Sequence, residues 1–405
     1  MVSGPVHLIV GAGQAGGHAA MAMREAGFAG RILLVGEEAH RPYERPPLSK
    51  EFLTAEQEPP VAYFHDAARY AERDIELLAG TAVVAVDVAA RRAMLADGRG
   101  LGWDRLLFAT GSRARRLAVP GGERIFYLRT LEDARAIRER LLPGRAVVCI
   151  GAGVIGLEIA SSARQRGCGV TVIEAAPGAM GRMLTPEMAD WMVRLHRAHG
   201  VGLHFGASIA AVTDGEVVCA GGPTVAADCV IAGVGIERNT ELAAAAGLAV
   251  DGGIVVDEFG RSSVPEVFAA GDVAAFWHPL LGRRLRLEAW RHAQNHGIAV
   301  GRVMAGAAAP YDDIPWFWTD QHGVNVQVAG LVDAPGVTVM RGEDTAASFA
   351  AFRLDAEGRV LSATGVNAPR EVRAAQAMIR AGKPVDAVAL ADPKVPLQRL
   401  VAAAR

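Results

Sequence analysis

The sequence has few cysteines and no excess of charge of either sign. Its four cysteines are scattered without a C-x-x-C pair or a zinc-ligand spacing, and a chain of 405 residues can fold without disulfides. We therefore expect neither a disulfide framework nor a metal site. Lys and Arg number 42 against 44 Asp and Glu, a net charge of -2, so the charge balance indicates neither a nucleic-acid-binding protein nor a polybasic membrane-surface protein.

A typical signal or membrane-spanning segment is also missing. Residues 1–23 carry no charge, but they include five glycines, two histidines and a glutamine, without a basic region. We interpret this stretch as a buried strand with a glycine turn, and we expect a cytoplasmic protein that does not enter a membrane. With 51% hydrophobic residues, 21% charged residues and 47 glycines, the composition is typical of a globular α/β chain of two or three domains.

The clearest pattern in the chain is an internal repeat. Residues 6–16 read VHLIVGAGQAG, and residues 147–156 read VVCIGAGVIG. Each copy passes from an apolar strand into G-x-G-x-x-G and an alanine-rich helix, and a second apolar run follows at 32–35 and at 170–173. Strand–helix–strand units of this kind form doubly wound parallel sheets.

Both copies have the features of a dinucleotide site. The glycines allow a tight turn and a close approach to a pyrophosphate, which then lies at the N-terminus of the helix. An acidic residue that can accept the ribose hydroxyls, Glu37 in one copy and Glu174 in the other, ends the next strand about 20 residues later. The alternative is that the glycines serve packing alone. Two dinucleotides in one chain indicate a redox pair, in which a nicotinamide delivers hydride to a second, tightly held carrier that should be a flavin.

The rest of the chain is organised around these two units. Residues 106–111 and 229–235 each form an apolar strand that ends in a glycine turn. Both turns are expected near a ligand, at Ala109, Thr110, Gly111 and Gly235. From Gln321 onward the sequence changes to short β-type runs and one amphipathic helix at 370–381. The predicted fold is α/β, with two doubly wound Rossmann-type domains and a C-terminal α+β domain.

Several further segments carry a resemblance to a known family. PEVFAAGD at 265–272 resembles the flavoprotein sequence whose Asp binds the FAD ribitol, and RPYERPPLSK at 41–50 resembles the FAD-binding stretch of NADH-dependent ferredoxin reductases. Further matches lie at 127–133, 286–290, 293–294, 315–321, 369–371 and 397–400. The whole chain thus resembles the putidaredoxin-reductase-like components of bacterial aromatic-ring dioxygenase and haem monooxygenase systems, with rubredoxin reductases and apoptosis-inducing factor as relatives.

The resemblance implies a domain order like that of glutathione reductase. A discontinuous FAD-binding domain would comprise 1–112 and 245–320, with an NADH-binding domain at 113–244 inserted between its parts. The α+β domain would comprise 321–405.

The resemblance also implies the residues of the sites. Those expected to hold FAD are Gly11, Gly13, Gly16, Glu37, Arg45, Lys50, Val83, Ala109, Thr110, Gly111, Arg129, Gly271, Asp272, Ala289 and Trp290. Those expected to hold NADH are Gly151, Gly153, Val154, Ile155, Gly156, Glu174 and Gly235. Lys50 and Glu158 would face each other beside the flavin N5, where the ammonium stabilises the reduced flavin. Trp318 would lie along the nicotinamide or the electron exit path. The alternative interpretations are that Lys50 is a surface lysine, Glu158 a glutamate on a helix face and Trp318 a core aromatic.

The implied function is an NADH:ferredoxin oxidoreductase that passes electrons singly to a two-iron ferredoxin supplying an oxygenase. The alternatives are a rubredoxin reductase, an NADH oxidase and, from another class, an NADH-switched binding flavoprotein resembling apoptosis-inducing factor. Thiol-dependent relatives carry cysteines soon after the first glycine turn, whereas here Cys149, in a buried strand, is the first. An acidic ferredoxin is expected to dock on basic residues, namely Arg283, Arg284, Arg286, Arg291 and Arg302, unless these belong to a solvated loop. A weak homodimer is left open.

Overall fold

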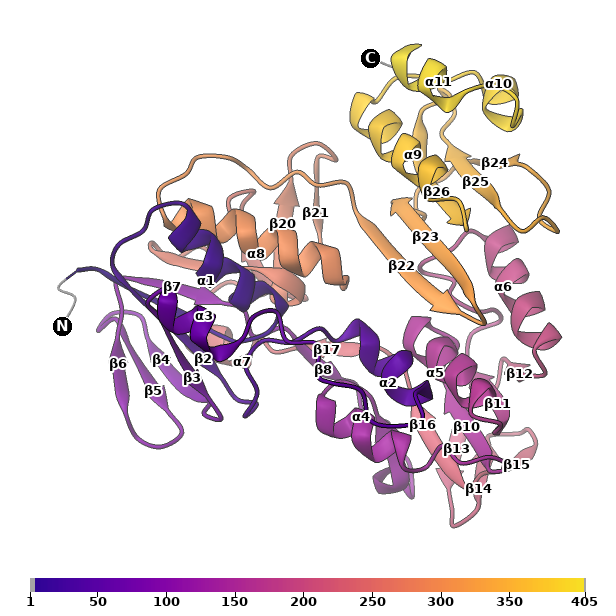
Figure 1. Cartoon of the computed structure of the whole chain (residues 1–405), viewed down its shortest axis with the longest axis horizontal. Helices are drawn as coiled ribbons and strands as arrows, with labels where there is room; N and C mark the ends of the chain where they lie inside the picture. The colour runs from indigo at the N-terminus through magenta and orange to yellow at the C-terminus, as the bar shows by residue number, and fades with distance from the viewer. Residues whose placement is uncertain (1–3, 404–405) are drawn as a thin grey trace. The chain divides into compact units, whose positions relative to one another are not determined.

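A computed structural model of the protein describes the structure of residues 4–403. Its contacts divide the chain into two compact units (Figure 1). The first comprises the chain up to Glu44, then Pro60–Arg113 and Ile236–Asp313. The second comprises Arg45–Pro59, Ala114–Gly235 and the chain from Ile314 onward. The division into three domains stays a prediction.

The first unit is built on a five-stranded parallel sheet. Its strands, in spatial order, are β19 (Val267–Ala269), β7 (Arg105–Phe108), β1 (Val6–Val10), β2 (Arg31–Gly36) and β3 (Ile75–Ala79). The central strands are apolar and buried on both faces, as parallel strands between helices must be. Helix α1 (Gln14–Glu25) connects β1 to β2 and ends before Gly27, whose φ of +85° allows the sharp stop.

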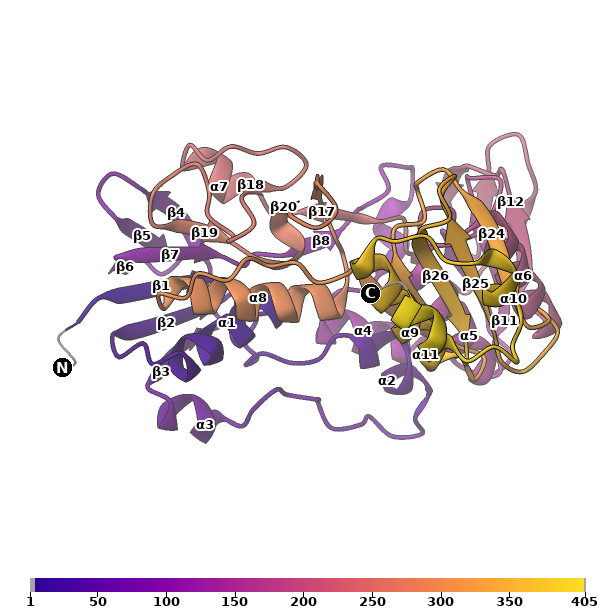
Figure 2. The same cartoon turned by 90° about the horizontal axis from the view of Figure 1, so that it is seen from above.

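Helix α8 (Trp290–Met304) lies against α1 (Figures 1 and 2). Two glycines one helical turn apart permit the close approach. A Cβ at Gly297 would lie 2.3 Å from the carbonyl oxygen of Ala15, and a Cβ at Gly301 would lie 2.5 Å from that of Ala19. Larger side chains at these positions would force the helices apart and expose the apolar core between them.

Smaller elements complete the first unit. They are the antiparallel sheet β4 (Val83–Asp87), β5 (Arg92–Leu95) and β6 (Gly100–Gly102), the sheet β18 (Ile254–Val256), β20 (Ala274–His278) and β21 (Arg283–Leu285), the helices α3 (Ala67–Glu72) and α7 (Glu241–Ala245), and the turn η3 (Gly271–Val273). Strand β17 (Ile236–Arg238) pairs with β8 (Ser112–Ala114).

The second unit repeats the architecture of the first. Its parallel sheet has the order β12 (Gly202–Phe205), β11 (Gly169–Glu174), β10 (Ala146–Ile150), β16 (Cys229–Ala232) and β9 (Ile125–Tyr127). Its helices are α4 (Leu131–Arg138), α5 (Val154–Gln165) and α6 (Pro186–Ala198), with η2 at Gly122–Arg124 and a small antiparallel sheet of β13 (Ile209–Val212), β14 (Glu216–Cys219) and β15 (Thr224–Ala226). The two predicted Rossmann-type folds are therefore confirmed.

The segment 45–59 is held in the second unit by backbone carbonyls that accept from buried or half-buried side chains. It forms η1 (Pro46–Ser49) and α2 (Glu51–Thr54). Arg138 donates to the carbonyls of Phe52 and Ala55 at 2.7 and 2.6 Å, and Ser162 donates to that of Ser49 at 2.6 Å. These contacts fix the position of the residue that follows η1, Lys50.

The C-terminal part of the second unit is an antiparallel sheet covered by a helix. The strands lie in the order β22 (Trp316–Gln321), β23 (Val324–Gly330), β26 (Val360–Val366), β25 (Phe349–Leu354) and β24 (Val337–Arg341). Helix α9 (Pro369–Ala381) packs on β23 and β26 (Figure 1), and the short α10 (Ala387–Ala391) and α11 (Leu397–Ala403) follow. The helix predicted at 370–381 is confirmed, and it ends at Gly382, whose φ is +63°. Strand β22 was not foreseen.

Within residues 4–403, no helix is both long and apolar enough to span a bilayer. Over the same residues, His, Cys, Asp and Glu side chains form no group of three or more suited to a metal ion.

Candidate functional site

The first glycine turn has the backbone geometry of a phosphate cradle. Gly11 has φ +114°, and a Cβ there would lie 2.2 Å from the carbonyl oxygen of Ala109. A Cβ at Gly16 would lie 1.9 Å from the carbonyl oxygen of Gly11. Gly13 is the N-cap of α1 and supplies no side-chain cap, which leaves the first backbone N–H groups of the helix open to an anion.

The loop after β7 and the turn η3 meet at the same edge of the sheet. Thr110 and Asn239 exchange two hydrogen bonds of 2.7 and 2.8 Å, and Gly111 adopts φ +62°. Asp272 accepts from the hydroxyl of Ser112 at 3.2 Å. A Cβ at Gly271 would lie 2.8 Å from that of Ala15, at the start of α1, so the structure brings the predicted FAD residues of these segments together.

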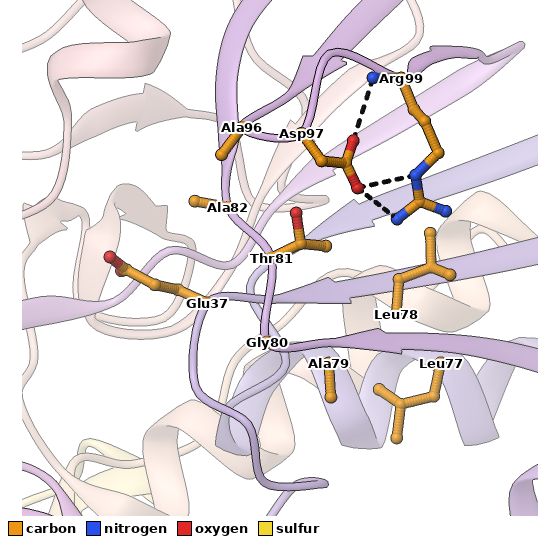
Figure 3. A pocket seen from close by; sticks show the side chains of 10 residues that line it. All are labelled: Glu37, Leu77, Leu78, Ala79, Gly80, Thr81, Ala82, Ala96, Asp97 and Arg99. Carbon is orange, nitrogen blue, oxygen red and sulfur yellow. Dashed lines mark hydrogen bonds and ion pairs between the residues drawn. The ribbon is translucent and has the colours of Figure 1, made fainter.

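A cleft of about 670 Å³ opens beside the end of β2 (Figure 3). It is lined by Glu37, Leu77, Leu78, Ala79, Gly80, Thr81, Ala82, Ala96, Asp97 and Arg99. The carboxylate of Asp97 holds the guanidinium of Arg99 at 2.7 Å and accepts from its backbone N–H at 3.0 Å. Glu37 was predicted for such a site, whereas Val83 is not among the lining residues. The Asp97–Arg99 pair was missed, because nothing local in the sequence marks it.

Trp290 is the first residue of α8, after the N-cap Ala289. Its indole N–H donates to the carboxylate of Glu44, whose pKa is raised by burial. Asp272 is held from its other side by Arg238, which donates to its backbone carbonyl at 2.7 Å and to Glu288 at 2.8 Å. Neither Glu44 nor Arg238 was among the predicted site residues.

The second glycine turn repeats the geometry of the first. Gly151 has φ +100°, and a Cβ there would lie 2.6 Å from the carbonyl oxygen of Gly233. A Cβ at Gly156 would lie 2.0 Å from the carbonyl oxygen of Gly151. Gly153 is the uncapped N-cap of α5, of which Val154 and Ile155 are the first residues. This helix N-terminus is likewise open to a phosphate.

The carboxylate of Glu174 is held at the end of β11 by two backbone N–H groups. It accepts from Ala152 and from Ala176, both at 2.7 Å. Each carboxylate oxygen keeps a further lone pair for a ribose hydroxyl. Gly235, at φ +104°, lies near an exposed arginine, Arg182, whose Nη2 would be 3.9 Å from a Cβ at that position. Arg182 was not among the predicted site residues.

The three predicted catalytic residues come together in the second unit. The ammonium of Lys50 lies 2.9 Å from Oε1 of Glu158 on α5 and 5.8 Å from the ring centroid of Trp318 on β22. The side chain of Lys50 is 17% exposed and that of Glu158 is 3% exposed. Lys50 is therefore half-buried and ion-paired, and its role at the flavin stays a prediction.

The carboxylate of Glu158 has two further donors besides Lys50. The hydroxyl of Thr319 donates to Oε1 at 2.6 Å, and the hydroxyl of Ser49 donates to Oε2. Three donors satisfy a carboxylate that is almost fully removed from water. Ser49 and Thr319 lie in segments singled out from the sequence, but their contact with Glu158 was not foreseen.

The two predicted arginines, Arg45 and Arg129, lie close to each other. Nη1 of Arg45 donates to the backbone carbonyl of Arg129 at 2.5 Å. The backbone N–H of Arg129 donates to Asp133, which belongs to the capping box of α4. The start of α4 therefore sets the position of both arginines.

All four cysteines are buried, free thiols. Burial raises the pKa of Cys149, and it raises that of Cys229 to about 12. A thiol in this state is a poor nucleophile. The prediction that Cys149 is a buried thiol is confirmed.

Comparison with known proteins covers nearly the whole chain. Residues 6–297 match the pyridine nucleotide-disulphide oxidoreductase family, and residues 316–401 match the reductase C-terminal family. The ferredoxin–NAD(+) reductase component of the p-cumate 2,3-dioxygenase system of Pseudomonas putida is 41% identical over 96% of this chain and 97% of its own. Putidaredoxin reductase of Pseudomonas putida is 36% identical, over 98% and 97%. The crystal structure of the covalent putidaredoxin reductase–putidaredoxin complex superposes with a TM-score of 0.95 at 36% identity, covering 99% of each chain.

Proposed function

The chain belongs to the pyridine nucleotide-disulphide oxidoreductase family, and on that premise we propose that it is an NADH-dependent reductase that supplies electrons through FAD to a ferredoxin serving an oxygenase. The observation that carries this proposal is the pair of matching glycine turns, each at the start of a helix in its own parallel sheet. Relatives named as reductase components of dioxygenase systems match 96% of the chain.

The cofactors are FAD and NAD(H), and the residues of the first unit fit a dinucleotide. Gly11, Gly16 and Gly271 let the backbone pack closely at the start of α1, and a Cβ at the N-cap Gly13 would meet no atom within 4 Å, so bare backbone faces open space there. The cleft at Glu37 has room for the adenosine end. When bound, FAD accepts a hydride from NADH and returns the two electrons one at a time.

The protein's own residues would bind the two dinucleotides, orient them and place charge beside the flavin. We propose that Glu37 and Glu174 accept ribose hydroxyls, and that the two open helix N-termini hold the pyrophosphates. Lys50 would stabilise negative charge on the reduced flavin, with Glu158 keeping its ammonium in position. The ring of Trp318 would lie along the nicotinamide or along the path by which electrons leave the flavin. No side chain acts as a nucleophile in this scheme, which agrees with the burial of all four thiols.

We propose NADH, not NADPH, as the donor. A carboxylate at position 174 accepts hydroxyl groups but repels a 2′-phosphate dianion. The residues that follow it, Ala175, Ala176 and Pro177, offer no positive charge.

The acceptor would be a two-iron ferredoxin. Each turnover would convert one NADH and two oxidised ferredoxins into NAD⁺, one proton and two reduced ferredoxins. Among the arginines suggested for docking, Arg284 is half-buried and donates to the carbonyls of Val256 and Ala275, both at 2.8 Å. Arg283, Arg286, Arg291 and Arg302 are exposed and stay candidates for the docking surface, although Arg286 also pairs with Asp251 at 3.5 Å. A cytoplasmic location and a weak homodimer also remain predictions.

Stopped-flow reduction of the bound flavin tests the proposed donor reaction. NADH should bleach the flavin absorbance in a fast first phase, and NADPH should do so far more slowly. A ferredoxin should then reoxidise the flavin. Slow reduction by both donors, followed by a long-lived reduced complex, would instead favour a protein that binds NADH as a switch.

A further inference from the structure

A row of hydrogen-bonded side chains extends from the Lys50–Glu158 pair to imidazoles at the C-terminal end of α6. Oε1 of Glu158 accepts from Thr319 at 2.6 Å, and the hydroxyl of Thr319 accepts from Nε2 of Gln321 at 2.8 Å. Oε1 of Gln321 lies 2.6 Å from Nε2 of His196. Nδ1 of His196 lies 3.1 Å from Nε2 of His322.

The carboxylate at one end determines the direction of every bond in the row. An ionised Glu158 can only accept, so the Thr319 hydroxyl donates to it and must accept from the amide NH₂ of Gln321. The amide oxygen of Gln321 must then accept from an N–H on Nε2 of His196. This leaves Nδ1 of His196 as an acceptor for the N–H on Nε2 of His322. Each donor therefore points toward Glu158, and the tautomers of both imidazoles follow from the network.

The row is buried except at its outer end. Thr319, Gln321 and His196 are at most 1% exposed, so any member left without its partner would lose a hydrogen bond that water cannot replace. His322, half-buried, stacks on the exposed ring of His199 with centroids 4.1 Å apart and planes at 13°. Its backbone N–H donates to Ser161 on α5 at 2.7 Å.

Both imidazoles in the row are held in their neutral form. Burial lowers the pKa of His196, with the neighbouring His199 acting in the same direction. Burial, and then the positive charges that His196, His199 and Arg164 can carry, lower the pKa of His322 to about 3. Neutral rings can each donate one hydrogen bond and accept another, as the row requires.

We propose that Gln321 and His196 are positioning residues for the Lys50–Glu158 pair. They orient the Thr319 hydroxyl toward Glu158, and thereby hold the carboxylate and the ammonium that it binds. The row holds these groups and does not conduct a proton, because the amide nitrogen of Gln321 has no free lone pair to receive one. In this way two residues of β22, Thr319 and Gln321, help to fix the position of Lys50. The inference rests on the proposed role of Lys50 at the flavin.

Matched substitutions separate positioning from packing. Gln321→Leu removes both hydrogen bonds of the amide at similar size. His196→Leu removes the donor to Gln321, whereas His196→Gln can keep a donor in place of Nε2. Thr338→Val is the control, because the half-buried Thr338 of β24 donates to Glu187 on α6 at 3.1 Å and so also joins the C-terminal sheet to α6, outside the row.

The first readout is the rate of flavin reduction by saturating NADH. Gln321→Leu and His196→Leu should slow it about three- to tenfold, the rate equivalent of one buried hydrogen bond, with the Kd for NADH unchanged. His196→Gln should restore the rate to within about twofold, and Thr338→Val should not change it. Equal slowing in His196→Leu and His196→Gln would overturn the positioning role.

Two further readouts do not depend on NADH or on ferredoxin. The midpoint potential of the bound flavin should shift in Gln321→Leu in the same direction as in Lys50→Met, and by less. In the full-length protein labelled with ¹⁵N-histidine, the N–H on Nε2 of His196 should give a slowly exchanging downfield proton resonance that Gln321→Leu abolishes. An unchanged potential in Gln321→Leu, together with loss of that resonance, would show that the row does not act on Lys50. If NADH fails to reduce the wild-type flavin, the reductase assignment is wrong, and the potential still decides whether the row positions Lys50.

Discussion

The ion pair of Lys50 and Glu158 should contribute to stability as a coupled unit, and a double-mutant cycle measures that coupling. The perturbations are Lys50→Met, Glu158→Gln and the two together. Lys50→Met leaves the buried carboxylate with the hydroxyls of Ser49 and Thr319. Glu158→Gln leaves the ammonium with the carbonyl of Pro46 at 3.3 Å.

The expected magnitude follows from burial and distance. At 2.9 Å and an effective dielectric constant of about 20, the attraction between the two charges is about 6 kcal/mol, most of which offsets their desolvation. Removal of one partner from a buried pair costs about 3–5 kcal/mol. Because Lys50 keeps some contact with water and Glu158 keeps two hydroxyl donors, we expect about 2 kcal/mol for each single variant and a coupling energy of about 2 kcal/mol.

Urea unfolding followed by far-UV circular dichroism gives the four free energies, each read from the transition of the unit that holds the pair. The same cycle on Arg31 and Glu76 is the control, since this pair has the same 2.9 Å separation but side chains that are 46% and 51% exposed. Its coupling energy should be below about 1 kcal/mol. If the two changes at Lys50 and Glu158 simply add, with a coupling energy below about 0.5 kcal/mol, the two side chains do not act as a unit and the reasoning fails.

Three other predictions address the donor, the acid stability and the acceptor. Glu174→Ala should narrow the ratio of kcat/KM between NADH and NADPH, mainly through the KM of each donor, and an unchanged ratio would remove Glu174 from the ribose site. His292 and His296 are fully buried beside Phe276, and burial lowers the pKa of His296 from 6.5 to about 3 and that of His292 well below 6.5. Below pH 6.5 these histidines bind protons in the unfolded chain but not in the folded one, so the folded protein loses stability as the pH falls. The free energy of unfolding should therefore drop by about 1.4 kcal/mol per histidine from about pH 7.5 to about 5.5. The double variant His292→Gln with His296→Gln should flatten this slope, and an equal slope would contradict the assignment. Ferredoxin reduction should slow with rising salt, and Arg283→Glu should raise the KM for ferredoxin without affecting ferricyanide reduction; an unchanged KM would place the docking surface elsewhere.

Local chemistry explains why the two dinucleotide folds and the C-terminal helix could be predicted. The positive φ at Gly11 and Gly151 and the absence of a Cβ at Gly16 and Gly156 are direct consequences of a strand turning tightly into a helix. The apolar face of α9 and its stop at Gly382 likewise follow from the spacing of neighbouring residues.

Contacts between distant parts of the chain could not be predicted in the same way. Gln321 and His196 are separated by 125 residues, and neither lies in a pattern that identifies its partner. Arg284 stands among arginines that suggest a charged surface, yet its guanidinium is taken up by two backbone carbonyls. Such outcomes depend on which backbone groups tertiary packing leaves without partners, and the composition of a segment does not reveal this.

The stoichiometry of ferredoxin reduction tests the central claim most directly. The protein, loaded with FAD, is mixed anaerobically with a limiting amount of NADH and an excess of an oxidised two-iron ferredoxin, and both spectra are followed to completion. Because NADH donates two electrons and the ferredoxin accepts one, two ferredoxins should be reduced rapidly for each NADH consumed. Oxidation of NADH with the ferredoxin still oxidised, or a flavin that stays reduced beside oxidised ferredoxin, would contradict the assignment as a ferredoxin reductase.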